Sequence, residues 1–407
     1  MDETPPKVRP VQVRRRIGGD REAGRGRLRD IRGPHRERGC DNHSGGRSRP
    51  RSIGKKILGK TIRASSAPQA TMEPFPRYPP GEPAAQDSNS RPVRRTYAGK
   101  DLALLIPTKD RPKHIRLLLE SLSAQTVACG RVVIVDGGES IQAVLTGFLD
   151  RLPLEYYLCH PPGQIRQRNL GIGKLDDSTP LVGFLDDDLE LEPEAIEKMI
   201  GFWNGSEPDT AGVGFNVVNA PRVRASRITR LLFRGSTTPG RVLKSGYNSR
   251  IDNLREDLRT QWLGGGYTVW RKDVLEKFPQ PEIKTRWAIG EDLRFSYPIG
   301  KSRPLYVCAS ARVRHVPVMD QAPESSVHRF RGRKSSLATF YFVASHPELS
   351  RAACLWMLSA KCVGQLALGC AKLDTSMLQN GLGQAGAIWT CVRSLFGLAD
   401  IKSALED

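Results

Sequence analysis

The stretch LVGFLDDDLELEP, residues 181–193, decides the fold, because five apolar residues pass directly into three aspartates. A short, fully apolar run is typical of a strand at the centre of a parallel sheet. Neighbouring carboxylates repel one another, so Asp186, Asp187 and Asp188 either open a solvated turn or face something positive. Pro193 suits the first turn of a following helix. We therefore expect a buried strand, an acidic strand end and a helix in this order.

Strand and helix signals alternate on the N-terminal side of this stretch. Three more apolar runs indicate buried strands, and helical segments follow them: LALLIP (102–107), RVVIVD (131–136) and LEYYL (154–158). Strand alternating with helix four times is typical of a doubly wound sheet with right-handed connections. We expect an α/β, Rossmann-like domain that has a mostly parallel central sheet with flanking helices.

Acidic residues follow three of these predicted strands. Asp110 comes just after the first, Asp136 ends the second, and Asp186–Asp188 follow the fourth. Ligands of open α/β sheets bind beyond the carboxyl ends of the strands, so we expect these carboxylates at the ligand site. A calcium loop does not fit, because Leu191 stands at the position that requires glycine. A Mg²⁺ or Mn²⁺ ion shared with a substrate diphosphate fits better, since these ions take few protein oxygens.

The N-terminal segment, residues 1–95, differs from the rest in composition. It holds 23 Lys and Arg against 10 Asp and Glu, out of a net charge of +20 for the whole chain. It is rich in Arg, Gly and Pro without an apolar period, so we expect a disordered basic leader, with Met72 as an alternative start. Binding to nucleic acid and binding to anionic lipid both stay open. Aromatic residues are nearly absent before Phe75, which disfavours nucleic acid.

The C-terminal segment, residues 346–407, contains the apolar stretch AACLWMLSAKCVGQLALGC (352–370). Lys361, Gln365 and Lys372 share one helical face, and a lysine at the bilayer centre costs roughly 2.5–3.5 kcal/mol. We expect an amphipathic helix that lies on a membrane or packs on the preceding domain, in preference to a span. The chain has eight cysteines without a CxxC pair and no secretory signal, which favours the cytoplasm, including a peripheral position at the cytoplasmic face of the membrane.

Seven motifs follow one another in a fixed order: IPTKDRP (106–112), VDGGES (135–140), QRNLGI (167–172), FLDDD (184–188), WLGGGYTVWRKDVL (262–275), GEDLRF (290–295) and VRHVP (313–317). In type and order they resemble the motifs of family 2 glycosyltransferases with the GT-A fold. The resemblance covers roughly residues 101–345. Gly137 departs from it, because a second aspartate is usual at that position. The resemblance implies a GT-A domain over residues 96–345, between the leader and a helical tail.

The resemblance implies a UDP-, GDP- or dTDP-sugar donor. Asp136 would accept a hydrogen bond from the base, and Asp186 would face the ribose. Asp188 and His315 would bind a metal ion that bridges the phosphates; the less favoured alternative for His315 is an ordinary structural histidine. Arg168 would reach the base or the phosphates, or cap a helix. The expected donor-binding residues are Pro107, Thr108, Asp110, Asp136, Arg168, Asp186 and Asp187.

Transfer to an acceptor hydroxyl needs a base, because a hydroxyl is a poor nucleophile until it loses its proton. By the resemblance, Asp292 is the candidate base and would act from the face opposite the leaving group, which inverts the anomeric carbon. The alternative is a carboxylate that only suits a helix N-terminus. Glu291 would orient the acceptor or hold the loop. Gly265 and Gly266 would let the backbone approach the acceptor closely.

The main hypothesis is therefore a metal-dependent inverting hexosyltransferase. Its expected acceptor is a glycan or a lipid-linked sugar in envelope polysaccharide or exopolysaccharide assembly. A sugar nucleotidyltransferase is an alternative, but IPTKDRP lacks the glycine-rich phosphate loop of such enzymes. A nucleic-acid-binding protein that acts through its Arg-rich leader is an alternative from another class.

Overall fold

The computed structural model describes residues 95–221, 238–280, 282, 289–316 and 325–406 of the 407-residue chain. All of these residues belong to one compact unit. The predicted leader, residues 1–95, lies outside the described residues except for Arg95. Met72, the alternative start, also lies outside the described residues.

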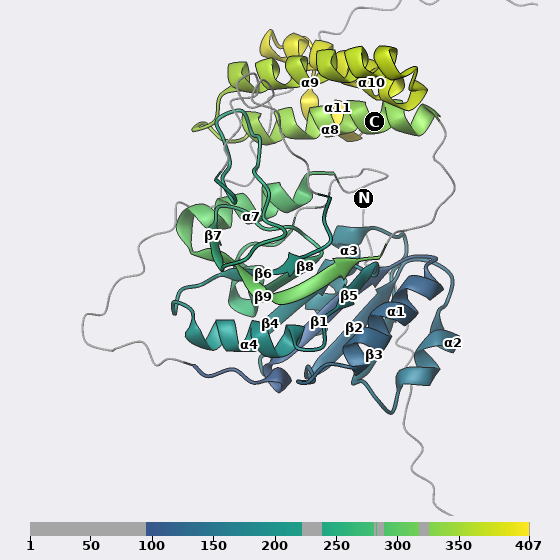
Figure 1. Cartoon of the computed structure of the whole chain (residues 1–407), viewed down its shortest axis with the longest axis vertical. Coiled ribbons are helices and arrows are strands. Elements are labelled where there is room, and N and C mark those ends of the chain that lie inside the picture. Colours follow the sequence, from purple (N-terminus) through teal and green to yellow (C-terminus); the bar gives the residue numbers. More distant parts are fainter. Residues whose placement is uncertain (1–94, 222–237, 281, 283–288, 317–324, 407) are drawn as a thin grey trace, which may run out of the picture. The chain divides into compact units, whose positions relative to one another are not determined.

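A nine-stranded sheet forms the centre of this unit, with the order β3-β2-β1-β4-β8-β6-β9-β5 and with β7 paired to β9 (Figure 1). The strands are β1 (Leu102–Thr108), β2 (Arg131–Asp136), β3 (Leu154–Leu158), β4 (Leu181–Leu185), β5 (Leu189–Leu191), β6 (Gly212–Val217), β7 (Leu258–Thr260), β8 (Tyr267–Arg271) and β9 (Leu305–His315). All four strands predicted between residues 102 and 185 are present, so the strand pattern of this half is confirmed.

The sheet is mixed but mostly parallel. β1 pairs in parallel with β2 and β4, β2 with β3, and β6 with β9. β8 runs antiparallel to both β4 and β6, while β5 and β7 run antiparallel to β9. The α/β class and the mostly parallel sheet are therefore confirmed, with antiparallel strands inserted in its second half.

Helices flank the sheet and continue beyond it. They are α1 (Pro112–Ser123), α2 (Gln142–Leu145), α3 (Gln164–Ile172), α4 (Ala195–Gly205), α6 (Lys272–Lys277), α7 (Glu291–Ser302), α8 (Ser325–Ala344), α9 (Arg351–Lys372), α10 (Thr375–Leu395) and α11 (Ile401–Glu406). The helical segment expected after β2 is only partly formed, because α2 passes into a short 3-10 turn at Thr146–Phe148. Pro193 precedes α4 and does not lie in its first turn.

Two apolar clusters sandwich the sheet. Leu104 and Ile106 of β1 lie in one cluster, and Ala103 and Leu105 of the same strand lie in the other. Successive side chains of a strand point to opposite faces, so a strand covered on both faces must be apolar throughout. Helices α1 and α4 supply the first cluster and α6 and α7 the second. This burial explains why LALLIP and LVGFL carry no polar alternation.

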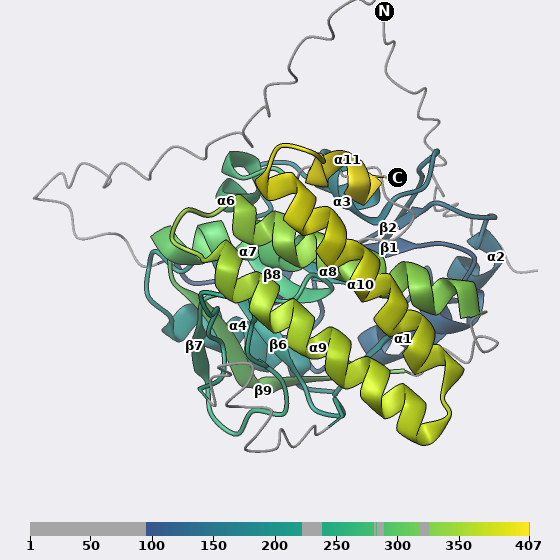
Figure 2. The ribbon, with the colours of Figure 1, turned by 90° about the horizontal axis from the view of Figure 1, so that it is seen from above.

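A third apolar cluster joins the C-terminal helices. Tyr297 of α7 packs in it with residues of α8, α9, α10 and α11. Helices α9 and α10 run side by side and cross α8 (Figure 2). Cys354, Met357 and Leu358 of α9 are buried in this cluster. The predicted helix over residues 352–370 is thus confirmed, and one of its faces packs on protein.

Candidate active site

The polar ends of β1, β2 and β4 lie at one edge of the sheet. Thr108 is the register partner of Asp136, and Leu105 is the partner of Phe184, so the residues after Leu185 emerge beside Thr108. Thr108 Oγ1 donates a 2.7 Å hydrogen bond to Asp187 Oδ2. The structure therefore brings the acidic strand ends together, as the strand pattern predicts.

Each of the three consecutive aspartates has a basic neighbour. Arg168 Nη2 lies 3.0 Å from Asp186 Oδ1. Arg111 Nη1 lies 3.0 Å from Asp187 Oδ1 and 3.8 Å from Asp188 Oδ2. These side chains offset the repulsion between the carboxylates. Arg168 was predicted as a site residue. Arg111 was not predicted, although it stands within the motif IPTKDRP.

The environments of Asp187 and Asp188 shift their pKa values in opposite directions. Burial raises the pKa of Asp187 above its ordinary value, against the opposing effects of Thr108 and Arg111. Burial also acts to raise the pKa of Asp188, but His315 and Arg111 outweigh it and hold that pKa below its ordinary value. Asp188 is therefore the member of the pair that is held ionised.

The pairing of β5 with β9 brings His315 next to Asp188. Leu189 is the register partner of His315, and Val316 N donates to Asp188 O at 2.8 Å. His315 Nδ1 lies 3.6 Å from Asp188 Oδ1. Asp188 and His315 are far apart in the sequence, so no local pattern shows that they are neighbours. Both were nevertheless predicted as metal ligands.

The donor set at this point fits a divalent cation. Asp188 Oδ1 is buried and has no hydrogen-bond partner, although a carboxylate oxygen needs one when it is removed from water. Carboxylate oxygen is the ligand type that Mg²⁺ and Mn²⁺ prefer, and the neighbouring imidazole is a common metal ligand. Among the described residues, no cluster of three or more His, Cys, Asp or Glu side chains suits a metal ion. The protein would thus supply two ligands here and leave the others to a bound substrate and water.

The glycine loop before β8 separates two carboxylates at close range. A Cβ at Gly265 would lie 1.8 Å from Asp292 Oδ1, and a Cβ at Gly266 would lie 1.9 Å from Asp186 Oδ2. Asp186 N also donates to Gly266 O at 2.7 Å. Only glycine allows this approach, so the loop lies directly against both Asp186 and Asp292. Contact between these two glycines and an acceptor stays a prediction.

Helix α7 presents Asp292 in its first turn. Gly290 precedes the helix with a φ of 69°, a left-handed conformation that favours glycine. Ser296 Oγ accepts a 2.9 Å hydrogen bond from Leu263 N and donates at 2.7 Å to Asp292 O. These contacts couple the start of α7 to the glycine loop. The ED motif and the glycine motif therefore form one local structure.

The electrostatics of Asp292 suit a base near neutral pH. Its pKa is raised to about 7, mainly by burial and also by the Glu291 carboxylate, while Arg168 acts to lower that pKa. Burial also raises the pKa of Glu291, whose Oε2 is buried without a hydrogen-bond partner. A carboxyl group whose pKa lies near the working pH can both hold and release a proton. The predicted roles of Asp292 and Glu291 stay predictions, and the geometry is compatible with them.

Arg168 lies beneath the site and not on its surface. Only 1% of its side chain is exposed, and its guanidinium lies over the Phe184 ring at 5.4 Å. Its Nη1 lies within 3.1 Å of the place that a Gly265 Cβ would occupy. Arg168 therefore supports Asp186 and the glycine loop from below. A direct contact with donor, which the sequence analysis expected, stays a prediction.

Asp136 is also an internal residue in this structure. It is fully buried, its Oδ1 accepts a 2.8 Å hydrogen bond from Gly138 N, and its Oδ2 accepts one of 2.8 Å from Tyr156 Oη. These bonds hold the turn after β2. The predicted contact with a nucleotide base stays a prediction, since a base would have to share an oxygen that is already bonded.

Gly137, which departs from the family pattern, has a steric explanation. A Cβ at this position would lie 2.7 Å from Pro162 Cβ. The loop that follows β3 therefore fills the space that a larger side chain would need. The glycine at position 137 is therefore explained by the packing of this loop. It does not alter the arrangement of Asp186–Asp188.

The remaining predicted donor residues lie at the end of β1. Pro107 is a buried member of the strand, and Asp110 follows it with a φ of 55°. Asp110 Oδ1 accepts a 2.9 Å hydrogen bond from Glu139 N, which joins the loops after β1 and β2. Gln164, which was not predicted, donates a 2.9 Å hydrogen bond from Nε2 to Asp186 Oδ1. Its position just before the QRNLGI motif was the only signal for it.

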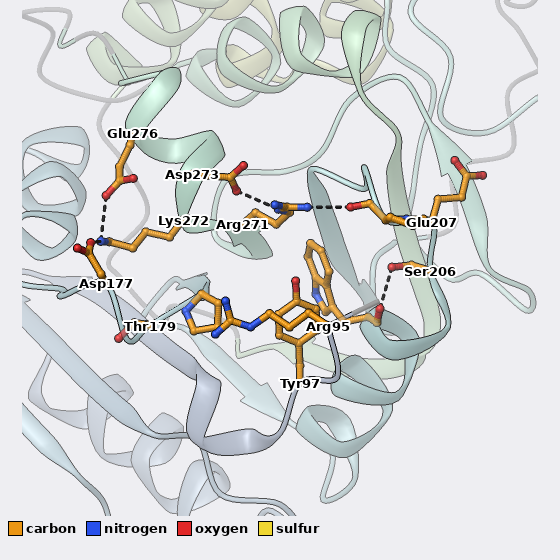
Figure 3. A pocket seen from close by; sticks show the side chains of 13 residues that line it. Arg95, Tyr97, Asp177, Thr179, Ser206, Glu207, Arg271, Lys272, Asp273 and Glu276 are labelled. Atoms are coloured by element: carbon orange, nitrogen blue, oxygen red, sulfur yellow. Dashed lines mark hydrogen bonds and ion pairs between the residues drawn. The ribbon is translucent and has the colours of Figure 1, made fainter. Parts of the chain in front are cut away.

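A cavity of about 520 Å³ lies away from these residues (Figure 3). It is lined by Thr179 and Pro180, which precede β4, and by Arg271, which ends the antiparallel strand β8. It therefore opens at the opposite edge of the sheet from Asp186. Lys272 in its wall lies 2.9 Å from both Asp177 and Glu276, so its charged groups pair with one another.

The mostly parallel sheet, the acidic end of β4 and the glycine loop before β8 together have the architecture of the GT-A fold. Residues 103–278 match the model of the family described as Glycosyl transferase family 2. This part of the chain is therefore similar to the domain of that family. No curated protein sequence matches the chain.

Solved structures show more distant likenesses. TarS 1-349 from S. aureus is 17% identical, with 73% of this chain and 83% of TarS covered and a TM-score of 0.45. The mannosyltransferase PcManGT from Pyrobaculum calidifontis, solved in complex with GDP-Man and Mn²⁺, is 13% identical. That comparison covers 74% of this chain and 88% of PcManGT, with a TM-score of 0.45.

Proposed function

We propose that this protein is an inverting glycosyltransferase that moves a sugar from a nucleoside-diphosphate donor to an acceptor hydroxyl. One observation carries the proposal. Asp186, which follows β4, lies against Gly266, and Asp292, at the start of α7, lies against the adjacent Gly265. A donor and an acceptor that meet at this loop would place the anomeric carbon between the two carboxylates.

The donor side consists of Asp186, Asp188 and His315. Asp188 and His315 would hold a Mg²⁺ or Mn²⁺ ion at the diphosphate, because Asp188 Oδ1 lacks a partner and the imidazole adjoins it. When bound, such an ion stabilises the negative charge that grows on the departing diphosphate. Asp186 is 29% exposed and is oriented by Arg168 and Gln164, which leaves it available for the ribose hydroxyls.

The acceptor side consists of Asp292 and Glu291. Asp292 takes the proton from the acceptor hydroxyl while the oxygen forms a bond to the anomeric carbon. The bond between that carbon and the diphosphate oxygen breaks, and the leaving group carries the electron pair away. Attack from the face opposite the diphosphate inverts the configuration. Glu291 stands beside the base, and its negative charge keeps the pKa of Asp292 high.

The proposed domain organisation places this chemistry in residues 96–345, with a leader before it and a helical tail, 346–407, after it. The donor would be a UDP-, GDP- or dTDP-hexose. The acceptor would be a glycan or a lipid-linked sugar in envelope polysaccharide or exopolysaccharide assembly, at the cytoplasmic face of the membrane. These finer assignments rest on the motif resemblance given above.

A donor screen tests the proposal. Purified full-length protein is incubated with UDP-, GDP- and dTDP-sugars, with and without Mg²⁺ or Mn²⁺, and release of the nucleoside diphosphate is measured. We expect one base class to be turned over and chelation to stop the release. The product's anomeric configuration is then read by NMR. Retention of configuration, or turnover unaffected by chelator, contradicts the proposed mechanism.

A further inference from the structure

Tyr267 is the first residue of β8 and directly follows the glycine loop, Gly264–Gly266. In the sheet it pairs with Leu185, the last residue of β4, so it stands beside the point where the acidic residues begin. Its side chain is partly buried and packs against the first apolar cluster. Tyr267 was not predicted as a site residue, but the sheet places it between the acidic end of β4 and the glycine loop.

The ring of Tyr267 contacts the imidazole of His315. The two ring centroids lie 6.0 Å apart and the ring planes stand at 88°, which is an edge-to-face arrangement. Asn219 holds the backbone of His315, because its side chain accepts from His315 N at 2.9 Å and donates to His315 O at 2.8 Å. Within the described part of the chain, the imidazole contacts no other ring, and its ion pair is with Asp188. The Tyr267 ring therefore limits the orientations in which the imidazole can face Asp188.

The hydroxyl of Tyr267 lies against the glycine loop. A Cβ at Gly264 would lie 2.3 Å from Tyr267 Oη and 2.4 Å from Tyr267 Cζ. The next two glycines lie in the same way against Asp292 and Asp186. Each of the three consecutive glycines therefore has a different polar side chain of the site packed on its backbone. Tyr267 Oη shares the small space around this loop with the two carboxylates.

This hydroxyl is available as a hydrogen-bond donor. Among the described residues, none makes a hydrogen bond with Tyr267 Oη. A tyrosine hydroxyl ordinarily keeps its proton at neutral pH, and burial raises the pKa of Tyr267 further. A protonated hydroxyl in a partly buried site gains from an acceptor, and the oxygens of a sugar are acceptors of this kind.

The position of Tyr267 determines which part of a donor its hydroxyl would meet. The Tyr267 ring adjoins His315, which with Asp188 would hold the metal ion at the diphosphate. The hydroxyl lies at the other end of the ring, on the loop that also packs against Asp292, the proposed base. The sugar is the part of the donor that lies between the diphosphate and the attacking acceptor. The hydroxyl would therefore face the sugar and not the base of the nucleotide.

We propose that Tyr267 is a further residue of the donor side, whose hydroxyl donates a hydrogen bond to the sugar that is transferred and whose ring fixes the imidazole of His315. The hydroxyl is a contact to substrate. The ring is a positioning group, since it acts on the metal site through His315. This inference rests on the proposed function, because it requires the donor sugar to lie between Asp186 and Asp292.

The variant Tyr267→Phe tests the hydroxyl, because it keeps the ring and removes one oxygen. The dissociation constants of UDP-, GDP- and dTDP-sugars and of the corresponding nucleoside diphosphates are measured by calorimetry with the full-length protein and Mn²⁺. We expect the nucleotide sugar to bind roughly three- to tenfold more weakly, while the nucleoside diphosphate binds within about twofold of the unchanged protein. The control is Tyr306→Phe, because Tyr306 Oη donates at 2.7 Å to Glu207 at the exposed surface. Tyr306→Phe should bind both compounds like the unchanged protein.

The variant Tyr267→Leu tests the ring. Binding of Mn²⁺ alone is measured by electron paramagnetic resonance, without nucleotide. A group that orients a metal ligand typically contributes 10- to 100-fold to metal affinity, so we expect Tyr267→Leu to bind Mn²⁺ at least about tenfold more weakly. Tyr267→Phe keeps the edge-to-face contact and should bind Mn²⁺ like the unchanged protein. A thermal unfolding curve shows whether Tyr267→Leu is folded; if it is not, the comparison of nucleotide sugar with nucleoside diphosphate in Tyr267→Phe decides.

Three results would overturn the proposal. Tyr267→Phe may bind the nucleotide sugar as tightly as the unchanged protein does, or it loses the same affinity for the nucleoside diphosphate, which would assign the hydroxyl to the phosphates. The third result is a folded Tyr267→Leu that binds Mn²⁺ without loss. Failure of the proposed function gives a different pattern, because the unchanged protein itself then binds neither nucleotide sugar nor Mn²⁺, and both the function and the role of Tyr267 are refuted.

Discussion

Arg168 Nη2 lies 3.0 Å from Asp186 Oδ1 while only 1% of the Arg168 side chain is exposed. The same guanidinium lowers the pKa of Asp292, against the stronger effect of burial. One buried cation therefore acts on a carboxylate of the donor side and on the proposed base. This relationship makes the two halves of the site interdependent.

Replacing Arg168 by Met should slow transfer and change its pH dependence. Removal of the positive charge raises the pKa of Asp292 further, so the acidic limb of kcat/KM should move to higher pH. The control is Arg166→Met on the same helix, because Arg166 pairs at the surface with Glu282 at 2.7 Å. That pair is exposed and should matter little. An unchanged pH profile in Arg168→Met would show that Arg168 supports the fold alone.

The rate of transfer should depend on pH through Asp292. Its pKa is raised to about 7, so the carboxyl is protonated below that pH and cannot accept the hydroxyl proton. We expect kcat/KM to fall about tenfold per pH unit below about pH 7 and to level off above it. The measurement is a pH series of kcat/KM for the unchanged protein and for Asp292→Asn. The residual rate of Asp292→Asn should not show the fall below about pH 7.

Replacing Gly265 by Ala should disturb the base more than the fold. The new Cβ would lie 1.8 Å from Asp292 Oδ1, so the carboxylate must move. A displacement of about 1 Å at a reacting group costs roughly 100-fold in rate. Gly201→Ala is the matched control, because its Cβ meets nothing within 4 Å in α4. If both variants keep full activity, the loop does not position Asp292.

Restoring the family's aspartate at position 137 should destabilise this protein. The Cβ would lie 2.7 Å from Pro162 Cβ, which forces the loop after β3 to shift. We expect a loss of about 1–3 kcal/mol in the free energy of unfolding. Gly147→Asp, where a Cβ meets nothing within 4 Å, should stay close to the unchanged protein in the same urea titration. Equal stability of both variants would refute the steric explanation.

The first half of the sheet could be predicted because its strands are buried on both faces. LALLIP, RVVIVD and LVGFL are apolar at successive positions, and only a strand between two layers requires this. The second half could not be predicted in the same way. β5 has three residues, β6 contains Gly212 and Gly214, and β9 mixes buried apolar residues with exposed arginines. β5 is too short and β6 too rich in glycine to show a period, and β9 alternates only from Ala309 to Arg314.

The residues of the candidate site were likewise predictable only in part. Asp186–Asp188 and Asp292 could be named from motifs, since each follows a recognisable strand or starts a helix. Their partners could be named only in part, because Arg168 and His315 stand in motifs whereas Arg111 was given no role. The packing of α1 against β5 and of α3 against β1 and β2 brings Arg111 and Arg168 to these aspartates. The pairing of β5 with β9 places His315 next to Asp188. Contacts that depend on tertiary packing cannot be predicted from the local sequence.

The most direct test of the account is transfer by Asp292→Asn, with donor binding measured on the same preparation. We predict that the transfer rate falls by about 10²–10⁴-fold, because a general base contributes that much, while the donor Kd changes by less than about twofold. A thermal unfolding curve confirms that the variant is folded. Transfer at the unchanged rate, or loss of donor binding in a folded variant, would contradict the role assigned to Asp292.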